Sequence, residues 1–430
     1  MLRGARQTGK TTVVNMFSKG FEQFVSLNLD LLQDRKNWEG DPTCEQLLRN
    51  IEISKGIRIF PGKTLLFIDE IQNDPRAIQS LRYLYEQKPD LHVIATGSLM
   101  EVALKNKGFS FPVGRVSFLY LYPLQFDEFL QVQGHQELLE ELQSLRWIKA
   151  PSQAVHSMAS DHFCEYLFLG GMPEVIRRYA EEKSHLLLTG VKEGLLTSFE
   201  GDVPKYARPA HVAHIQFLIR QAPLFAGQRI QYANFAHSGY PGREMREAFE
   251  ILEQAMITER ILGTNQTILP MQPQLRVSPK LLYLDVGLVS HRLAVDLQSL
   301  KRGDLNDLFR GTIAEQIVGQ ELIAQNALRR EAPLFWCRNK AGSEAETDYC
   351  ISLKGLAMPI EVKSGKSGRL RSLLQFMEQA PHAYATRIYS GPLQTDTLTT
   401  SGGKQFTLLS VPFYLTFRLR EILEDWVGAS

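Results

Sequence analysis

Cysteine is scarce in this sequence, with four residues among 430. No two of them form a CxxC pair, and they lie far apart, at Cys44, Cys164, Cys337 and Cys350. Such spacing argues against a disulfide framework and against a zinc site. Scattered cysteines fit a reducing compartment, so we expect a cytoplasmic protein.

Long apolar runs and an excess of charge of one sign are also lacking. No run approaches the roughly 18 apolar residues of a membrane span, and the polar, glycine-rich segment after Met1 does not resemble a signal peptide. We therefore expect no membrane partner. Lysine and arginine number 48 against 47 acidic residues, so any nucleic-acid surface must be a local patch.

The length and the hydrophobic pattern predict several α/β domains. A chain of 430 residues is too long for one core. In the first 130 residues short apolar runs alternate with amphipathic stretches, which is typical of a parallel sheet. We expect strands at 25–29, 65–68, 91–95 and 118–122. Helical patterns dominate from about 135 to 300, and strands return from about 330 to 415.

A phosphate-binding loop is the strongest motif. Residues 4–11 fit the pattern G-x-x-x-x-G-K-[ST]. Glycines let the backbone N–H groups point at phosphates, Lys10 reaches the β- and γ-phosphates, and the Thr11 hydroxyl binds Mg²⁺. The predicted nucleotide-binding residues are Gly4, Ala5, Arg6, Gln7, Thr8, Gly9, Lys10, Thr11 and Thr12. An ordinary glycine turn before a helix is the alternative.

A second motif fits the same site. The apolar run 65–68 ends in Asp69 and Glu70, and an α/β sheet binds its ligand at the carboxyl ends of its strands. There Asp69 can hold the Mg²⁺ shell, and Glu70 can orient and polarise the attacking water. A solvated strand end is the alternative, but the two motifs together predict ATP and Mg²⁺ as cofactors.

The chain resembles the prokaryotic AAA-type ATPases that carry a DUF4143 C-terminal region. The resemblance covers almost the full length and rests on the two motifs above and on residues 97–99, 113–115, 122–129, 170–174, 283–288 and 360–365. In such proteins a full strand precedes the phosphate loop, whereas only Met1, Leu2 and Arg3 do here. We therefore expect an AAA-like parallel sheet that is truncated before its first strand, with either a shortened chain or a crippled ATPase core as the reason.

The resemblance also implies two further ATPase residues. Thr96 ends a predicted strand together with Gly97 and Ser98, where AAA+ ATPases place a polar sensor of the γ-phosphate. A helix N-cap by Thr96 or Ser98 is the alternative. Arg115 could supply charge to the transition state in cis or from a neighbouring subunit of a ring, or it could be a plain surface arginine.

The middle of the chain is expected to resemble a winged helix between Gln216 and Ile261. A turn at 239–242 precedes a helix from Arg243, whose apolar face is Met245, Ala248, Phe249, Leu252 and Met256. Arg243 and Arg246 could touch phosphates, but four glutamates share the helix, at 244, 247, 250 and 253. A packing or regulatory role and direct DNA contact both stay open. We assign no chemistry to the turn at 170–174 and no role to Asp202.

The C-terminal region carries a candidate metal site that resembles the PD-(D/E)xK nuclease core. Residues i and i+2 of a strand share a face, so Glu361 and Lys363 point together, and Asp348 can join them from the neighbouring strand. Glu315, on a helix expected from 311 to 327, could complete the set. Carboxylates from Glu315, Asp348 and Glu361 would hold Mg²⁺ while Lys363 assists cleavage. An alternating strand with solvated charges is the alternative.

The same region holds the best candidate for a nucleic-acid footprint. Four basic residues fall within nine positions without an acid among them, at Lys363, Lys366, Arg369 and Arg371. DNA is therefore a candidate partner of the C-terminal domain. A solvated loop and helix start is the alternative.

We expect four regions: an AAA-type ATPase core at 1–130, a helical lid or linker at 131–205, a winged-helix-like region at 206–300 and a restriction-endonuclease-like α/β domain at 301–430. The favoured function is hydrolysis of ATP to drive or gate an attached nuclease-like module. The alternatives are a non-catalytic nucleotide switch or protein-interaction module, and a truncated remnant with weak nucleotide binding. A homo-oligomer is a further candidate partner.

Overall fold

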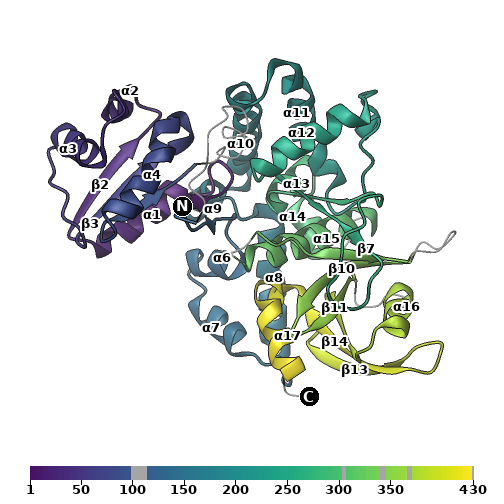
Figure 1. Ribbon diagram of the computed structural model, residues 1–430. Helices are drawn as coiled ribbons and strands as arrows, with labels where there is room; N and C mark the ends of the chain where they lie inside the picture. The colour runs from purple at the N-terminus through teal and green to yellow at the C-terminus, as the bar shows by residue number, and fades with distance from the viewer. Residues whose placement is uncertain are drawn as a thin grey trace.

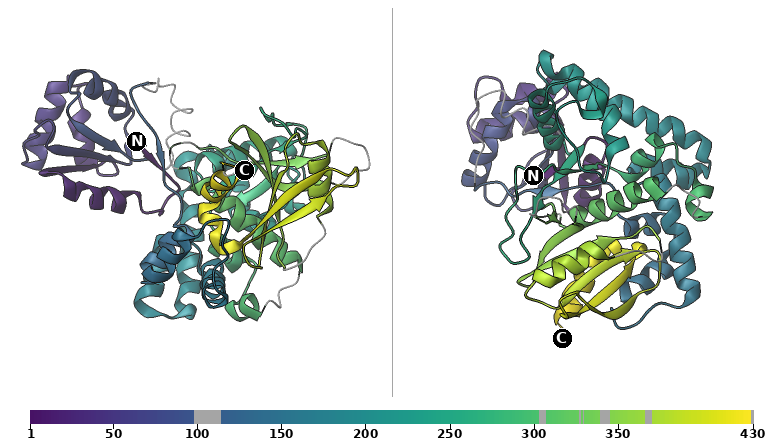
Figure 2. Two further views of the ribbon diagram at one scale, coloured as in Figure 1. Left: turned by 90° about the horizontal axis from the view of Figure 1, so that it is seen from below. Right: turned by 90° about the vertical axis from the view of Figure 1, so that its right-hand side faces the viewer.

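The computed structural model describes residues 1–97, 114–302, 307–326, 328, 330–338, 345–365 and 370–428. It is a mixed α/β structure in which the N-terminal lobe lies beside a larger body formed by the rest of the chain (Figures 1 and 2). No helix in the described ranges combines the length and the apolar character that a bilayer crossing requires.

The N-terminal lobe is built on a parallel sheet. Its elements are β1 (Leu2–Arg3), α1 (Lys10–Phe17), β2 (Gln23–Asn28), α2 (Leu32–Arg35), α3 (Cys44–Lys55), β3 (Thr64–Asp69), α4 (Pro75–Gln87), β4 (His92–Ala95) and β5 (Leu119–Tyr120). Strands β2, β3 and β4 pair in parallel, and β1 pairs in parallel with β5. A single bridge between Leu2 and Thr96 joins the two sets, which places the strands in the order β2-β3-β4-β1-β5. All six residues of β3 are buried, as expected for a central strand.

Strands β2, β3 and β4 agree with the sequence prediction to within two residues. Strand β1 was not predicted: the sheet was expected to be truncated before its first strand, but Leu2 and Arg3 form a short strand there. The predicted strand at 118–122 is only Leu119–Tyr120 in the structure. The reason is its partner: β1 consists of Leu2 and Arg3, and a ladder extends no further than the shorter of its two strands.

The middle region is mainly helical. Its helices are α6 (Phe126–Val132), α7 (Gln136–Ser144), α8 (Gln153–Leu169), α9 (Pro173–Glu182), α10 (His185–Tyr206), α11 (Pro209–Gln221), α12 (Gly242–Gln254), α13 (Val286–Arg292) and α14 (Leu297–Arg302). Helices α11 and α12 pack together, and the antiparallel pair β6 (Thr258–Ile261) and β8 (Lys280–Tyr283) follows. Helix α12 ends at Gln254, so Met256 is buried in the connection behind the helix and not on its face.

The C-terminal region holds a seven-stranded mixed sheet. Its elements are β7 (Gly263–Thr264), α15 (Asp307–Ala324), β9 (Leu334–Cys337), β10 (Glu346–Leu353), β11 (Leu356–Val362), α16 (Arg371–Gln379), β12 (Tyr384–Tyr389), β13 (Gln394–Thr399), β14 (Gln405–Pro412) and α17 (Leu419–Gly428). The strand order is β13-β14-β12-β11-β10-β9-β7. Strands β10 and β11 form an antiparallel hairpin around a turn at Lys354 and Gly355, and β11, β12 and β14 are parallel.

Helices cover both faces of this sheet (Figure 1). Alternate residues of β10 serve the two sides: Cys350 packs with Phe376 of α16, whereas Tyr349 packs in the core that contains Ile317 of α15. The helix expected at 311–327 is α15, which begins earlier, at Asp307, and ends at Ala324.

The cores do not follow the four expected regions. The sheet of the N-terminal lobe has its own core around Val25, Leu66 and Ile68. A second core runs without interruption from Phe126 through the middle helices to Trp426. Strand β7 lies before residue 300, yet it pairs with β9 of the C-terminal sheet. The boundary expected at 300 therefore crosses a shared sheet and a shared core.

Candidate functional site

The phosphate loop connects β1 to the first turn of α1. Gly9 has a φ of 90°, a left-handed conformation that favours glycine, and α1 begins at the next residue. The free N–H groups of that first turn can therefore face an anion. Lys10 is 6% exposed, and its Nζ donates to Gly4 O at 3.1 Å and to Ala5 O at 2.8 Å. Burial lowers the pKa of Lys10, while the nearby carboxylates of Glu70 and Asp69 raise it in part.

Asp69 connects three parts of this site. It is the last residue of β3, and its Oδ2 accepts a hydrogen bond from Thr11 Oγ1 at 2.8 Å. Its Oδ1 accepts from Thr96 Oγ1. Hydroxyl and carboxylate oxygens are the ligands that Mg²⁺ prefers, and Mg²⁺ in such sites takes its other ligands from water and phosphate. Thr11 and Asp69 therefore fit a magnesium ion.

Glu70 lies next to this carboxylate in a strained conformation. Its φ is 51°, in the left-handed region that non-glycine residues rarely adopt. Gln72 Nε2 donates to Glu70 Oε2, and Glu70 acts on the pKa of Lys10, so the two side chains lie near each other. Burial raises the pKa of Glu70 above its ordinary value.

The two residues that the resemblance added have different positions. Thr96 is fully buried, and its Oγ1 donates to Asp69 Oδ1. Arg115 Nε donates to Glu86 Oε1 at 3.1 Å. Glu86 is in the last turn of α4, roughly 16 Å along the helix axis from Pro75 at about 1.5 Å per residue. Arg115 therefore lies beside the end of α4 in its own chain. Ser98, Leu99 and Val113 lie outside the described residues.

The phosphate loop also contacts helix α10, which the sequence did not predict. Arg6 forms an ion pair with Asp202, and Gln7 Nε2 donates to Ser198 Oγ at 3.2 Å. Asp202 also pairs with Lys205 over 2.7 Å. Residues nearly two hundred positions apart therefore link the loop to the middle region. Asp202 had no assigned role in the sequence, where nothing local shows that it meets the phosphate loop.

Three other shared segments meet at a structural junction. Asp285 Oδ2 accepts from Gly171 N at 2.6 Å, and Asp285 Oδ1 accepts from Leu288 N at 3.1 Å in the first turn of α13. Leu124 N donates to Gly171 O at 2.8 Å, and a Cβ on Gly171 would lie 2.1 Å from Leu124 O. Burial raises the pKa of Asp285 to about 6. The packing leaves no room for a side chain at Gly171.

The candidate metal site in the C-terminal sheet brings the expected carboxylates close together. The register of the β10–β11 hairpin, in which Tyr349 faces Ile360, sets Asp348 opposite Glu361. Asp348 Oδ2 accepts from Val362 N at 2.7 Å, and Lys363 Nζ lies 2.6 Å from Glu361 Oε1. Burial and the charge of Asp348 raise the pKa of Glu361 to about 8. Its Oε2 is buried and accepts no hydrogen bond from the described residues.

Lys280 also belongs to this cluster, although nothing in the sequence pattern indicated it. It begins β8, a strand of the middle region that reads as an ordinary apolar run. Its Nζ lies 2.8 Å from Glu315 Oε2, 2.8 Å from Glu346 Oε1 and 3.2 Å from Asp348 Oδ1. Burial alone would lower the pKa of Lys280, but these carboxylates outweigh it and hold the pKa well above its usual range. Glu346, two residues before Asp348 on the same face of β10, was also missed.

The residues of this cluster do not fit a divalent metal ion as they stand. Glu315, Asp348 and Glu361, predicted as metal ligands, each contact a lysine ammonium group. Within the described ranges no group of three or more His, Cys, Asp or Glu side chains could hold a metal ion. Of the predicted basic footprint, Lys366 and Arg369 lie outside the described residues, and Lys363 pairs with Glu361.

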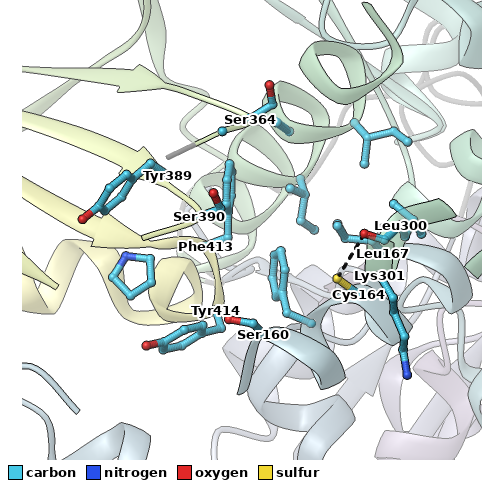
Figure 3. A pocket seen from close by; sticks show the side chains of 16 residues that line it. Ser160, Cys164, Leu167, Leu300, Lys301, Ser364, Tyr389, Ser390, Phe413 and Tyr414 are labelled. Atoms are coloured by element: carbon cyan, nitrogen blue, oxygen red, sulfur yellow. Dashed lines mark hydrogen bonds between the residues drawn. The ribbon is translucent and has the colours of Figure 1, made fainter. Parts of the chain in front are cut away.

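A cavity of about 560 Å³ adjoins the cluster at the carboxyl ends of β11, β12 and β14 (Figure 3). Ser364 and Gly365, which follow Lys363, form part of its wall, and Phe163, Ile317 and Phe413 make much of the rest apolar. Cys164 Sγ donates to Leu300 O at 3.8 Å, and burial raises the pKa of this thiol to about 11. An apolar wall and a protonated thiol do not suit a phosphate backbone or a nucleophile.

Comparisons with known proteins agree with the reading of the N-terminal lobe. Residues 1–130 match the family model of an AAA domain. Residues 160–299 and 310–414 match two domains of unknown function, DUF8612 and DUF4143. No curated protein sequence matches the chain.

Among solved structures, the chain is similar to the Aeropyrum pernix ORC2 protein, whose structure was determined as ADPNP-ADP complexes. The identity is 11%, the TM-score is 0.27, and the match covers 71% of this chain and 88% of that one. A TM-score this low supports no inference about fold or function. The family match and the geometry of the loop, by contrast, support a nucleotide-binding module of the AAA ATPase type at residues 1–130, followed by a C-terminal DUF4143 region.

Proposed function

We propose that residues 1–130 bind and hydrolyse ATP, and that the nucleotide state drives or gates a rearrangement of the attached regions. The observation that carries this proposal is the position of Asp69, whose two oxygens accept hydrogen bonds from Thr11 and Thr96. Thr11 and Asp69 would hold Mg²⁺, which supplies charge neutralisation on the phosphates. Side chains of this chain would bind the phosphates and orient the attacking water.

Lys10 is the phosphate-binding cation in this proposal. Its Nζ donates to the carbonyls of Gly4 and Ala5, and a phosphate oxygen at the loop would replace these acceptors. Burial strengthens the attraction because the ammonium group is shielded from water. Glu70 would orient the attacking water and accept its proton, a task that a raised carboxylate pKa favours.

The gating role rests on the contacts between the loop and α10. Arg6 and Gln7 lie within the phosphate loop, and their partners Asp202 and Ser198 belong to the middle region. A change in loop conformation on nucleotide binding would therefore act directly on α10. A non-catalytic switch uses the same contacts, and it differs only in lacking turnover.

The experiment compares Lys10→Ala with Lys19→Ala, which removes an exposed lysine just after α1. MgATP binding is measured by calorimetry and hydrolysis by phosphate release, with circular dichroism as the folding control. The proposal predicts that Lys10→Ala loses at least about tenfold in affinity or turnover, the loss of roughly 1.4 kcal/mol, while Lys19→Ala resembles the wild type. If Lys10→Ala binds and hydrolyses ATP normally, the nucleotide site is elsewhere.

Nucleic-acid cleavage by the C-terminal sheet is a second candidate. The approach of Asp348 to Glu361 across the hairpin favours it. The lysine contacts of the cluster speak against it. Incubation of the full chain with single- and double-stranded DNA and Mg²⁺ or Mn²⁺ tests it, with Asp348→Asn as the control for contaminating nuclease. Cleavage that Asp348→Asn abolishes would establish this activity.

A further inference from the structure

Four carboxylates gather on the C-terminal sheet and α15, from Glu315, Glu346, Asp348 and Glu361. Lys280 contacts the first three within 3.2 Å, and Lys363 contacts the fourth at 2.6 Å. Arg229 also contacts Glu346, at 3.4 Å. The cluster therefore already contains its counter-charges, as buried acidic groups require.

Lys280 is the most deeply placed of these cations. Its side chain is 3% exposed, and it lies against the ring of Phe335, with Nζ 5.6 Å from the ring centroid. An ammonium group has three N–H donors, and three carboxylates surround it. Its Nζ donates to Glu315 Oε2, to Asp348 Oδ1 and to the carbonyl oxygen of Asp348, and it forms an ion pair with Glu346. Hydrogen bonds and opposite charges thus surround the ammonium group, which is the arrangement that makes a buried ion pair stable.

We propose that the ammonium group of Lys280 is the resident cation of this carboxylate cluster and takes the place of a divalent metal ion. A metal ion would need its oxygen ligands at roughly 2.0–2.6 Å. The oxygens of Glu315 and Asp348 instead converge on Nζ. A divalent ion among the same oxygens would also meet the like charge of the lysine at close range.

The ammonium group of Lys280 also has a structural role, because the lysine and its acidic partners lie in different regions of the chain. Lys280 begins β8, which pairs with β6 of the middle region, whereas its acidic partners belong to β10 and α15. The ion pairs of Lys280 thus hold the middle region against the C-terminal sheet, next to the place where β7 pairs with β9. The cluster is thus an internal ion-pair contact between the two regions. Removal of the Lys280 amine creates a site for a divalent cation. This inference is independent of the proposed ATPase function.

The test removes the amine and asks whether a metal ion can replace it. All variants carry Asp69→Asn, which disables the cation site of the ATPase lobe, and are stripped of metal with chelator and kept free of nucleotide. The thermal unfolding midpoint is then measured with and without millimolar MgCl₂ or MnCl₂. The parent is compared with Lys280→Met, which keeps the length of the side chain, and with Lys280→Met combined with Asp348→Asn.

Lys192→Met is the matched control. Lys192 is 2% exposed like Lys280, but its Nζ donates to the carbonyl oxygen of Phe168 and not to the cluster. Its removal should lower the midpoint without creating a metal response.

We expect the parent to have the same unfolding midpoint with and without metal ion. Lys280→Met should unfold at a lower temperature without metal, and MnCl₂ should raise its midpoint by several degrees, because an ion that binds only the folded state stabilises it. The added Asp348→Asn should remove this rise. A metal-dependent rise in the parent that Asp348→Asn abolishes would overturn the proposal, as would a folded Lys280→Met that does not respond.

A direct binding measurement decides the case if Lys280→Met does not fold. Mn²⁺ is titrated into the folded parent and into its Asp348→Asn derivative, and free Mn²⁺ is followed by electron paramagnetic resonance. Equal, weak binding to both proteins supports Lys280 as the resident cation. A stoichiometric site in the parent that is lost with Asp348→Asn contradicts it.

Discussion

Thr11 donates a hydrogen bond to Asp69 across 2.8 Å, and this contact joins the first turn of α1 to the end of β3. Because Thr96 at the end of β4 donates to the same carboxylate, one acidic group connects the loop, the central strand and the next strand. A ligand that binds Asp69 will therefore act on all three elements.

Replacement of Thr11 tests the hydroxyl of this contact. Thr11→Ala should reduce MgATP turnover by at least about tenfold, because the alanine offers neither a hydrogen bond to Asp69 nor an oxygen for the metal ion. Thr11→Ser keeps the hydroxyl and should retain most of the activity. Steady-state phosphate release at varied MgCl₂ concentration measures both. Equal activity of the alanine and serine variants would remove Thr11 from the site.

The ion pair between Arg6 and Asp202 is expected to transmit the nucleotide state to α10. Arg6 is 40% exposed, so its loss should lower stability by no more than about 1 kcal/mol. Hydrogen exchange of residues 185–206 should respond to MgATP in the wild type but much less in Asp202→Asn. The exchanged pair, Arg6→Asp with Asp202→Arg, should regain part of the response. A full response in Asp202→Asn would show that the signal travels by another route.

Asp285 should matter for stability and not for nucleotide binding. Asp285→Ala removes the cap of α13 and leaves the buried N–H of Gly171 without its acceptor. We expect a loss of about 2–4 kcal/mol in the free energy of unfolding. Asp296→Ala removes an exposed acceptor of the Ser299 N–H and should cost clearly less than Asp285→Ala. Urea unfolding measures the loss of free energy of unfolding in both variants. Similar losses would show that the buried contacts of Asp285 stabilise the fold no more than an exposed helix cap does.

Glu165 predicts a pH dependence of stability. The neighbouring side chains of His162, 3.6 Å away, and Lys301, 3.2 Å away, lower the pKa of this carboxyl to about 2, whereas an unfolded glutamate titrates near 4.3. A lowered folded pKa contributes stability above the unfolded pKa that is lost as the pH falls toward the folded one. Glu165→Gln should therefore cost about 1–2 kcal/mol at pH 7 and little near pH 2–3. Glu137→Gln, an exposed change on α7, should cost little at either pH, and a pH-independent loss in Glu165→Gln would contradict the assignment.

Local patterns predicted the parts of the protein that depend on neighbouring residues. The loop before α1 and the apolar strand that ends in Asp69 are continuous in sequence, and Asp348 and Glu361 are joined by a short hairpin whose register follows from its turn. The contacts that the sequence did not predict join distant segments. Arg6 meets Asp202, and Lys280 meets Glu315 and Asp348. A lysine at the start of an apolar strand has no local signal that shows which acids it will meet, since the packing of two regions decides it.

The most direct measurement of the central claim compares MgATP binding and hydrolysis in the wild type and in Glu70→Gln. The glutamine keeps the shape of the side chain but cannot accept a proton, so we predict wild-type affinity with turnover lowered by about 10²-fold or more. Binding is measured by calorimetry and turnover by phosphate release under single- and multiple-turnover conditions. Turnover in Glu70→Gln equal to that of the wild type, or a wild type that binds MgATP without hydrolysing it, would contradict the account.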